Sequence, residues 1–289
     1  MAIVETWCPP SREHWELLIF LWQFFPFFTL YLWLFSYYPM GKTSTESRLN
    51  VPGKIGWATM EAPGFITLLY LMYSLPKQEG IERLPTVNWV MAGCFTVHYI
   101  YRALLAPLFL NPSISPIHIA VWASALGFQL INATCIGGWL AGYGPTTKAD
   151  WVGQAPRVEV GLTIFAIGML GNIYHDDELR EIRRAVAREQ KKKREIEDKK
   201  GGGKDVSKVY RIPENGLFRV VLFPHYLCEW IEWCGFWMVG GLACVPARQF
   251  VINEVTAMLP RAVQGKKWYV ERFGQAKIGN KKAVIPGLI

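Results

Sequence analysis

The sequence is short of charge over long stretches. Only 19% of its 289 residues are charged and 51% are hydrophobic, whereas soluble domains average about 25% charged residues. Asp, Glu, Lys and Arg are all absent from residues 17–41, 62–76, 84–101, 103–147, 160–174 and 233–247. A soluble protein would interrupt such runs with charged helix faces. The runs instead suit helices that cross a hydrocarbon layer, which takes about 20 residues, so the sequence indicates an integral membrane protein.

Residues that form metal centres and disulfides are also few. The six cysteines contain no C-x-x-C pair and five of them lie in apolar stretches, which favours buried thiols over a disulfide framework. The five histidines are scattered, so a histidine-rich di-iron site is excluded. His175-Asp176-Asp177 has no second histidine nearby, and we predict no metal. The fingerprints G-x-S-x-G, G-x-x-x-x-G-K-[ST] and G-x-G-x-x-G do not occur, so a bound nucleotide would not use a Rossmann turn.

Apolar density and turn residues predict an all-α membrane fold of about seven transmembrane helices without a Rossmann domain. The predicted spans are residues 15–38, 57–75, 86–108, 115–142, 155–175, 220–244 and 246–263. Acidic residues precede the first span, so we expect it to be retained rather than cleaved as a signal peptide. The chain then divides into an amino-terminal tail (1–14), a four-helix half (15–152) and a carboxy-terminal half (153–289).

The basic residues predict the orientation in the membrane. The net charge is +8, and an alternating path through seven spans places 25 of the 31 Lys and Arg residues on one side. Basic residues collect on the cytosolic face, so the amino terminus would face away from the cytosol and the tail would face it. The basic loop 180–210 mixes both charge signs and contains three glycines at 201–203. It suits a cytosolic segment near anionic headgroups better than a nucleic-acid-binding one.

Ionisable residues within apolar spans are costly and therefore mark candidate functional positions. They occur at Glu61, at His98, Tyr99, Tyr101 and Arg102, at Asn172 and 175–178, and at Glu229 and Glu232. At helical spacing Asn172, Asp176, Arg180 and Arg183 share one face. Such a row offers the acceptors, donors and positive charge that a ribose and phosphate ligand needs. An interfacial cap held by intrahelical ion pairs would have the same spacing, so spacing alone leaves both interpretations open.

Several motifs resemble one membrane enzyme family. The segments GNIYHD (171–176) with Leu-Arg (179–180), YRIPENGLF (210–218) and CEWIEW (228–233) resemble the carboxy-terminal domain of steroid 5-alpha-reductases. The tail segments KWYVERF (267–273) and NKKAVIP (280–286) resemble the ending of the same family. In the amino-terminal half the matching segments are MGK (40–42) with Glu-Ser (46–47), MEAP (60–63), and VHY (97–99) with Arg102. The resemblance therefore runs from about residue 40 to the end of the chain.

The resemblance implies a monomeric reductase of the endoplasmic reticulum membrane, with a lumenal amino terminus. Such an enzyme uses NADPH to saturate the carbon–carbon double bond of a 3-oxo-Δ4 steroid or a similar hydrophobic enone, giving the 5-alpha-reduced product. Residues 15–152 would form the substrate side and residues 153–289 the reductase domain. The family pattern makes Glu61 and Tyr99 catalytic, because both would hydrogen-bond the 3-keto oxygen. It assigns cofactor binding to Asn172, Asp176, Arg183, Tyr210, Arg211, His225, Glu229, Tyr269 and Lys281.

Two of these assignments have a structural alternative. The segment 210–213 could be a simple loop that enters the sixth span, and Glu229 could be a buried carboxylate that pins two helices. The sequence also departs from the family where Met60 replaces a glutamine, His225 an asparagine and Cys228 a glycine, and where the loop between residues 184 and 210 is longer. These changes bear on substrate preference and cofactor binding more than on the fold.

Four other functions compete with steroid reduction. A trans-2-enoyl-CoA reductase of fatty-acid elongation or a polyprenol reductase would share the chemistry. A non-catalytic sterol-binding membrane protein would have lost activity through the changes at Met60 and His225. An isoprenylcysteine-type methyltransferase would bind S-adenosylmethionine in place of NADPH.

Overall fold

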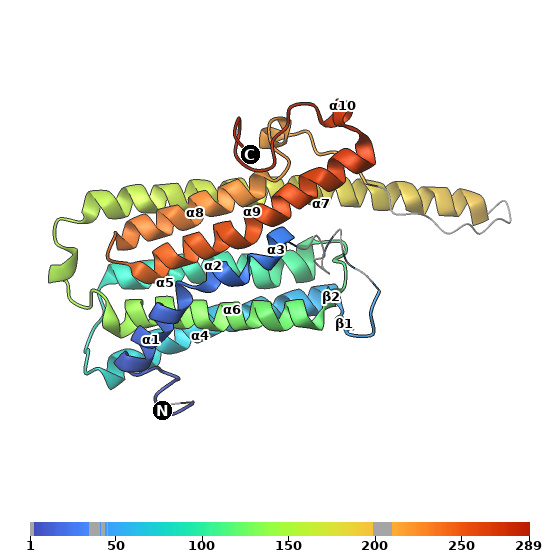
Figure 1. Cartoon of the computed structure of the whole chain (residues 1–289). Coiled ribbons are helices and arrows are strands. Elements are labelled where there is room, and N and C mark those ends of the chain that lie inside the picture. Colours follow the sequence, from blue (N-terminus) through green and yellow to red (C-terminus); the bar gives the residue numbers. More distant parts are fainter. Residues whose placement is uncertain (1–2, 35–40, 42–43, 45, 199–209) are drawn as a thin grey trace.

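The computed structural model describes residues 3–34, 41, 44, 46–198 and 210–289, and the long helices lie side by side in one bundle (Figure 1). The helices are α1 (Arg12–Trp22), α2 (Phe25–Phe28), α3 (Tyr31–Leu34), α4 (Gly53–Gln78), α5 (Thr86–Tyr99), α6 (Ile119–Gly138), α7 (Ala155–Asp198), α8 (Pro224–Gly240), α9 (Val245–Phe273) and α10 (Gln275–Ile278). The π-helical segments Ile100–Leu110 and Trp139–Tyr143 continue α5 and α6 directly. Two short 3-10 helices lie at Ala149–Trp151 and Gly216–Arg219.

Three of these helices are long and apolar enough to cross a membrane, and a bent pair makes a fourth. The three are Thr86–Leu110, Ile119–Tyr143 and Ala155–Lys192, and the bent pair is Arg12–Trp22 with Phe25–Leu34. The other predicted spans fall on α4, α8 and α9. Of these, α8 has only 17 residues, fewer than the roughly 20 that a straight crossing needs. The protein is thus mostly helical, and the described part of the chain contains three or four helices long and apolar enough to cross a membrane.

The first predicted span is broken rather than continuous. Its two parts meet at an angle of 45°, close to Pro26 at the start of α2. Proline has no backbone N–H, so a continuous helix through Pro26 would lack one of its hydrogen bonds. The helix begins at Arg12 rather than at residue 15, because the Ser11 side chain caps it by accepting the N–H of His14. Residues 35–38 of this predicted span, and residues 40 and 42 of the MGK segment, lie outside the described residues.

The prediction of a helix from residue 115 is wrong at its first residues. Ile117–His118 form a short strand, β2, that pairs antiparallel with β1 (Asn50–Val51). The helix α6 begins only at Ile119, and His118 caps it by accepting the N–H of Ala120. This small sheet joins the starts of α4 and α6. Apolar density alone does not indicate such a sheet.

The fifth span continues well beyond the apolar run. Helix α7 extends to Asp198, so the first half of the charged segment is helical as the sequence predicts, and this part projects past the other helices in Figure 1. Residues 199–209, which include the three glycines of the basic loop, lie outside the described residues. The long helix places Asn172, Asp176, Arg180 and Arg183 on one rigid element.

Glycines allow α7 and α8 to pack backbone to backbone. A Cβ at Gly168 would lie 2.3 Å from the backbone nitrogen of Glu232, and a Cβ at Gly235 would lie 2.3 Å from that of Phe165. No side chain can move to relieve such a contact. The close approach brings the carboxylates of α8 to the face of α7 that carries Asn172.

We expect Gly235→Ala to lower the free energy of unfolding by about 1–3 kcal/mol, because overpacking at a backbone contact forces the helices apart. Gly93→Ala is the matched control, since a Cβ at Gly93 would meet nothing within 4 Å. Thermal unfolding of both variants in detergent measures the difference. Equal stability of the two variants would contradict the packing described here.

Candidate active site

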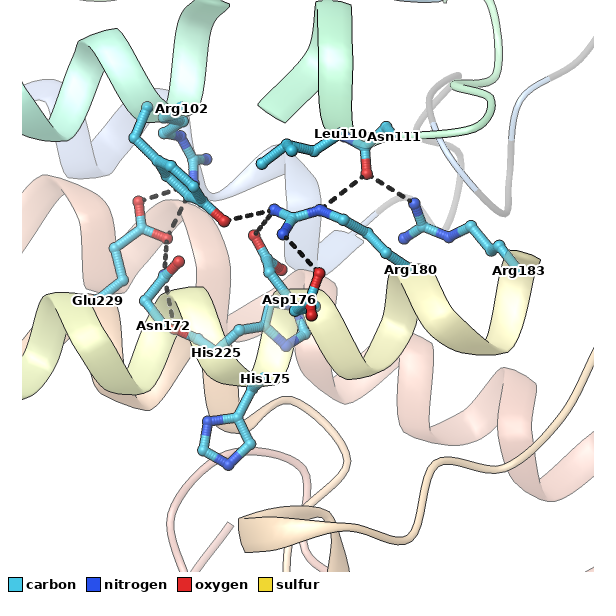
Figure 2. Close-up of polar contacts among 12 residues, drawn as sticks. Arg102, Leu110, Asn111, Asn172, His175, Asp176, Arg180, Arg183, His225 and Glu229 are labelled. Atoms are coloured by element: carbon cyan, nitrogen blue, oxygen red, sulfur yellow. Dashed lines mark hydrogen bonds and ion pairs between the residues drawn. The ribbon is translucent and has the colours of Figure 1, made fainter. Parts of the chain in front are cut away.

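A buried charge cluster joins α4, α8 and the π-helical segment after α5. The Arg102 Nε lies 3.1 Å from Glu61 Oε2 and its Nη1 lies 3.0 Å from Glu229 Oε1. The two carboxylate side chains are only 7% and 3% exposed. Because a buried charge is stable only when it is paired, Arg102 holds both carboxylates in place. Figure 2 shows Arg102 above Glu229.

Asn172 brings α7 into this cluster. Its side-chain nitrogen donates to Glu229 Oε2 at 3.2 Å and to the backbone carbonyl of His225 at 3.1 Å. Glu229 therefore accepts from two different helical elements and does pin helices together, as one interpretation of the sequence expects. The His225 ring packs instead among aromatic side chains, including Phe223 and Tyr226.

A second buried pair lies beside the first cluster. His98 Nδ1 and Glu232 Oε1 are 2.7 Å apart, and His98 Nε2 lies 3.9 Å from Glu229 Oε1. His98 is 4% exposed and Glu232 is fully buried. Two buried clusters of ionisable residues inside an apolar bundle mark a candidate functional site.

The row along α7 continues from the clusters toward the surface. Arg180, which is 2% exposed, donates to the Tyr101 hydroxyl at 2.7 Å and to Asn111 Oδ1 at 3.2 Å. It also pairs with Asp176 at 3.7 Å. Arg183 Nη1 reaches the same Asn111 oxygen at 3.3 Å, and Figure 2 shows the two guanidinium groups on either side of Asn111. The prediction that these side chains share one face is confirmed.

Comparison with known proteins identifies the family of the chain. The family model described as 3-oxo-5-alpha-steroid 4-dehydrogenase matches residues 115–289. The chain belongs to the steroid 5-alpha-reductase family. It is 32% identical to Steroid 5-alpha-reductase DET2 of Solanum lycopersicum over 91% of this chain and 92% of that protein. The expected resemblance is thereby confirmed.

Two further relatives span most of the chain. The uncharacterized protein C9.08c of Schizosaccharomyces pombe is 33% identical over 89% of this chain and 93% of that protein. The 3-oxo-5-alpha-steroid 4-dehydrogenase 1 of Bos taurus is 29% identical over 81% of this chain and 82% of that protein. Members of the steroid 5-alpha-reductase family are oxidoreductases that act on CH–CH groups.

The two residues that the family pattern makes catalytic are both buried in the same region. Glu61 is 6% exposed and Tyr99 is 2% exposed, and Tyr99 lies within electrostatic reach of Glu61. The Tyr99 ring packs against Phe95 at 4.6 Å and Trp233 at 6.1 Å between centroids. The two side chains thus come from different helices and lie in the same buried region, where Glu61 pairs with Arg102.

Tyr210 and Tyr269, which are predicted to bind the cofactor, both lie at the carboxy-terminal end of α9. Tyr210 packs edge to face on Trp268 at 4.9 Å, and the Arg272 guanidinium lies 4.7 Å from the centre of the Tyr210 ring. Tyr269 is 3% exposed and interacts electrostatically with Arg183 of α7. Segment 210–213 is therefore a packed loop next to the end of the α7 row.

Two of the three cations that are predicted to bind the cofactor contact other groups. Arg211 Nη2 lies 2.6 Å from Glu189 Oε2, farther along α7 than Arg183. Lys281 Nζ donates to the Pro213 carbonyl at 3.2 Å, and partial burial lowers the pKa of Lys281 from its ordinary value. Of the three predicted cations, only Arg183 contacts the same side chain, Asn111, that the buried Arg180 contacts.

His175 has a structural role. Its Nε2 accepts the backbone N–H of Leu217 at 3.1 Å and its Nδ1 lies 2.6 Å from the Gly171 carbonyl. Figure 2 shows its ring pointing away from the arginines. Within the described part of the chain, no three His, Cys, Asp or Glu side chains converge as a metal site would require.

The sequence assigns no role to some residues of the site. Arg102, His98 and Glu232 are candidate positions because they are ionisable residues in apolar runs, but the sequence does not show what they contact. Asn111 is a neutral amide, and nothing in composition or spacing distinguishes it from other polar residues. Its importance follows only from the contacts that the fold creates.

Proposed function

We propose that this protein reduces the carbon–carbon double bond of a 3-oxo-Δ4 steroid, or of a similar hydrophobic enone, with NADPH as the reductant. One observation carries the proposal: buried Glu61 and Tyr99 lie at one end of a polar row that runs along α7 to the exposed Arg183. A hydrophobic ketone suits the buried end of this row. A phosphate-bearing ligand suits its charged end.

The residues of the row fit a dinucleotide. Arg183 lies eleven positions after Asn172 on the helix, which corresponds to a rise of about 16 Å. Asn172 Oδ1 and the Glu229 carboxylate offer acceptors to an amide N–H at the buried end, and Arg183 offers a guanidinium fork to a phosphate. Arg180 is fully engaged by Asp176, Tyr101 and Asn111, so its role is to hold the row together. Tyr269, next to Arg183, completes the phosphate end.

The chemistry at the buried end depends on hydrogen-bond donors. NADPH would supply the hydride, which adds to the β-carbon of the enone. Negative charge then grows on the keto oxygen, and the α-carbon finally takes a proton. A donor aimed at that oxygen stabilises the transition state more than the bound ketone. Tyr99 is such a donor, and Glu61 becomes a second one only when it is protonated, since its carboxylate otherwise accepts from Arg102.

We further propose that the chain crosses the endoplasmic reticulum membrane seven times as a monomer, with the amino terminus in the lumen. The asymmetry of basic residues supports this orientation. Helices α4, α8 and α9 pack within the same bundle as the more apolar helices, which supports counting them as spans.

Turnover with three substrates tests the proposal. NADPH consumption by the detergent-purified protein is measured with a 3-oxo-Δ4 steroid, a trans-2-enoyl-CoA and a polyprenal. The mass of each product is determined by mass spectrometry. We expect a gain of two hydrogens on the steroid alone. Reduction of one of the other substrates would keep the mechanism and change the substrate class. Absence of NADPH binding would contradict the assignment of the protein as an NADPH-dependent reductase.

Arg183→Met is expected to raise the KM for NADPH by about tenfold or more, because a charge-assisted hydrogen bond to phosphate is lost, with a smaller change in kcat. Arg188→Met is the matched control, since Arg188 is exposed on the same helix and pairs with Glu181 at 3.6 Å. Steady-state kinetics of both variants measure the effect. An unchanged KM in Arg183→Met would remove Arg183 from the cofactor site.

A further inference from the structure

Residues 211–217, which we call the strap, lie along α7 and run in the direction opposite to the helix. The polar contacts of the strap with α7 include those of Arg211 with Glu189 at 2.6 Å, Asn215 with Glu178 at 2.7 Å and Leu217 with His175 at 3.1 Å. The partners on α7 thus move back from position 189 to position 175 as the strap advances. This stretch of helix rises about 21 Å, and six extended residues reach about 20 Å, so the strap is extended.

The strap has a buried anchor on α7 at Leu217. The side chains of Arg211 and Glu189, at the other end, are 44% and 54% exposed, and exposed ion pairs add little stability. His175 is instead 4% exposed. The ring of Phe218, directly after the strap, is fully buried and lies 5.5 Å from the His175 ring. The contact between Leu217 and His175 therefore fixes the strap more firmly than the exposed ion pair does.

Both ring nitrogens of His175 are engaged, and one protonation state satisfies both contacts. Nε2 accepts the backbone N–H of Leu217, so Nε2 carries no proton. The ring proton is then on Nδ1, which donates it to the Gly171 carbonyl at 2.6 Å. A neutral imidazole has one donor and one acceptor nitrogen. The ring of His175 therefore joins the backbone of α7 to the backbone of the strap.

Gly216 lets the strap come close to this ring. Its φ is +58°, a conformation that favours glycine, and a Cβ at this position would lie 2.9 Å from His175 Nε2 and 2.7 Å from Tyr174 Cε1. Both the backbone conformation and the lack of space therefore require glycine. With Gly216 in place, the N–H of Leu217 reaches Nε2.

We propose that His175 positions the strap for cofactor binding, an inference that rests on the function proposed above. Tyr210 and Arg211, which the family pattern assigns to the cofactor, stand at the far end of the strap. The Tyr210 ring packs on Trp268, next to Tyr269 at the phosphate end of the α7 row. The His175 ring points away from the arginines of that row (Figure 2). His175 is therefore a positioning residue, which acts on the cofactor only through the strap.

His175→Phe tests this role because it keeps a buried ring and removes both hydrogen bonds. The N–H of Leu217 is then left without its acceptor, and the strap loses its buried anchor. We expect the dissociation constant for NADPH, measured by fluorescence titration in detergent, to rise about 5- to 20-fold. His175→Gln should restore most of the affinity, because its amide oxygen can accept the N–H of Leu217.

Two further measurements separate positioning from a merely structural role. Hydrogen exchange of residues 211–217 without NADPH should be faster in His175→Phe than in the wild-type protein, and close to the wild-type rate in His175→Gln. At saturating NADPH, kcat of His175→Phe should stay within about twofold of the wild-type value, because the residues at the ketone are untouched. A merely structural role would lower kcat and the unfolding temperature along with the affinity.

Gly216→Ala provides a second variant, which leaves His175 in the chain. The added Cβ pushes the strap away from the ring, so we expect weaker NADPH binding and faster exchange of the strap, as in His175→Phe. Gly153→Ala is the matched control. The φ of Gly153 is +75°, so alanine is strained there too, but a Cβ would meet nothing within 4 Å.

The outcomes distinguish this inference from the proposed function. If the wild-type protein reduces the steroid with NADPH and both variants keep its dissociation constant, the positioning role is overturned while the function stands. A loss of affinity in His175→Phe that His175→Gln does not restore would also overturn it. If the wild-type protein binds no NADPH, the proposed function fails and the positioning role fails with it.

Discussion

Tyr99→Phe is expected to lower kcat for steroid reduction by about 10²- to 10³-fold, because it removes a donor aimed at the oxygen where charge develops. The substitution deletes one oxygen and keeps the ring that packs on Phe95 and Trp233. The fold and the α7 row should therefore be unaffected. Single-turnover kinetics with saturating NADPH measure the chemical step directly.

Two comparisons make this result specific. The dissociation constant for NADPH should stay within about twofold of the wild-type value, since Tyr99 contacts none of the residues that we assign to the cofactor. Glu61→Gln should also slow turnover, but by less than Tyr99→Phe, because an amide still donates a hydrogen bond and Tyr99 remains. Normal turnover in both variants would show that neither residue acts on the ketone.

Arg102→Leu is expected to destabilise the protein by about 3–5 kcal/mol, because it leaves Glu61 and Glu229 buried without their cation. This loss is a large part of the free energy of unfolding of a typical protein. We expect poor recovery of the folded variant in detergent and a large fall in its unfolding temperature. Arg102→Lys should recover part of the stability, since the charge returns without the two-pronged geometry of the guanidinium.

An exposed ion pair provides the control. Arg12 and Glu16 form a pair at 3.0 Å whose side chains are 66% and 59% exposed. Arg12→Leu should change stability by less than about 1 kcal/mol, as surface pairs do. A small effect of Arg102→Leu, similar to that of Arg12→Leu, would show that the two buried carboxylates do not depend on Arg102.

The sequence predicts the helices well because runs without charge are a strong signal. In the described part of the chain each predicted span overlaps a helix, and the helical extension of the charged segment is found up to Asp198. Local features of the chain explain where the predicted spans differ from the observed helices. Pro26 lies at the bend in the first span, and the pairing of residues 50–51 with 117–118 delays the start of α6. Neither feature changes the apolar density from which the spans were predicted.

For the site residues too, the sequence predicts the arrangement within one helix but not the contacts between helices. Helical spacing places Asn172, Asp176 and Arg183 on one face, and the structure confirms it. Spacing within one helix says nothing about partners on other helices, however. The pairing of Arg102 with both Glu61 and Glu229 joins residues that are 41 and 127 positions apart. Such contacts arise only when the helices pack together in three dimensions.

In the mechanism that we propose, hydride passes from NADPH to the β-carbon of a steroid enone held by Tyr99. Its most direct test is a turnover with NADPH carrying deuterium at the transferable position, followed by mass spectrometry of the product. We expect one deuterium in the reduced steroid, bound at the β-carbon, and a second hydrogen that comes from solvent. A reduced steroid without deuterium, or deuterium on the carbonyl carbon as in an alcohol product, would contradict it.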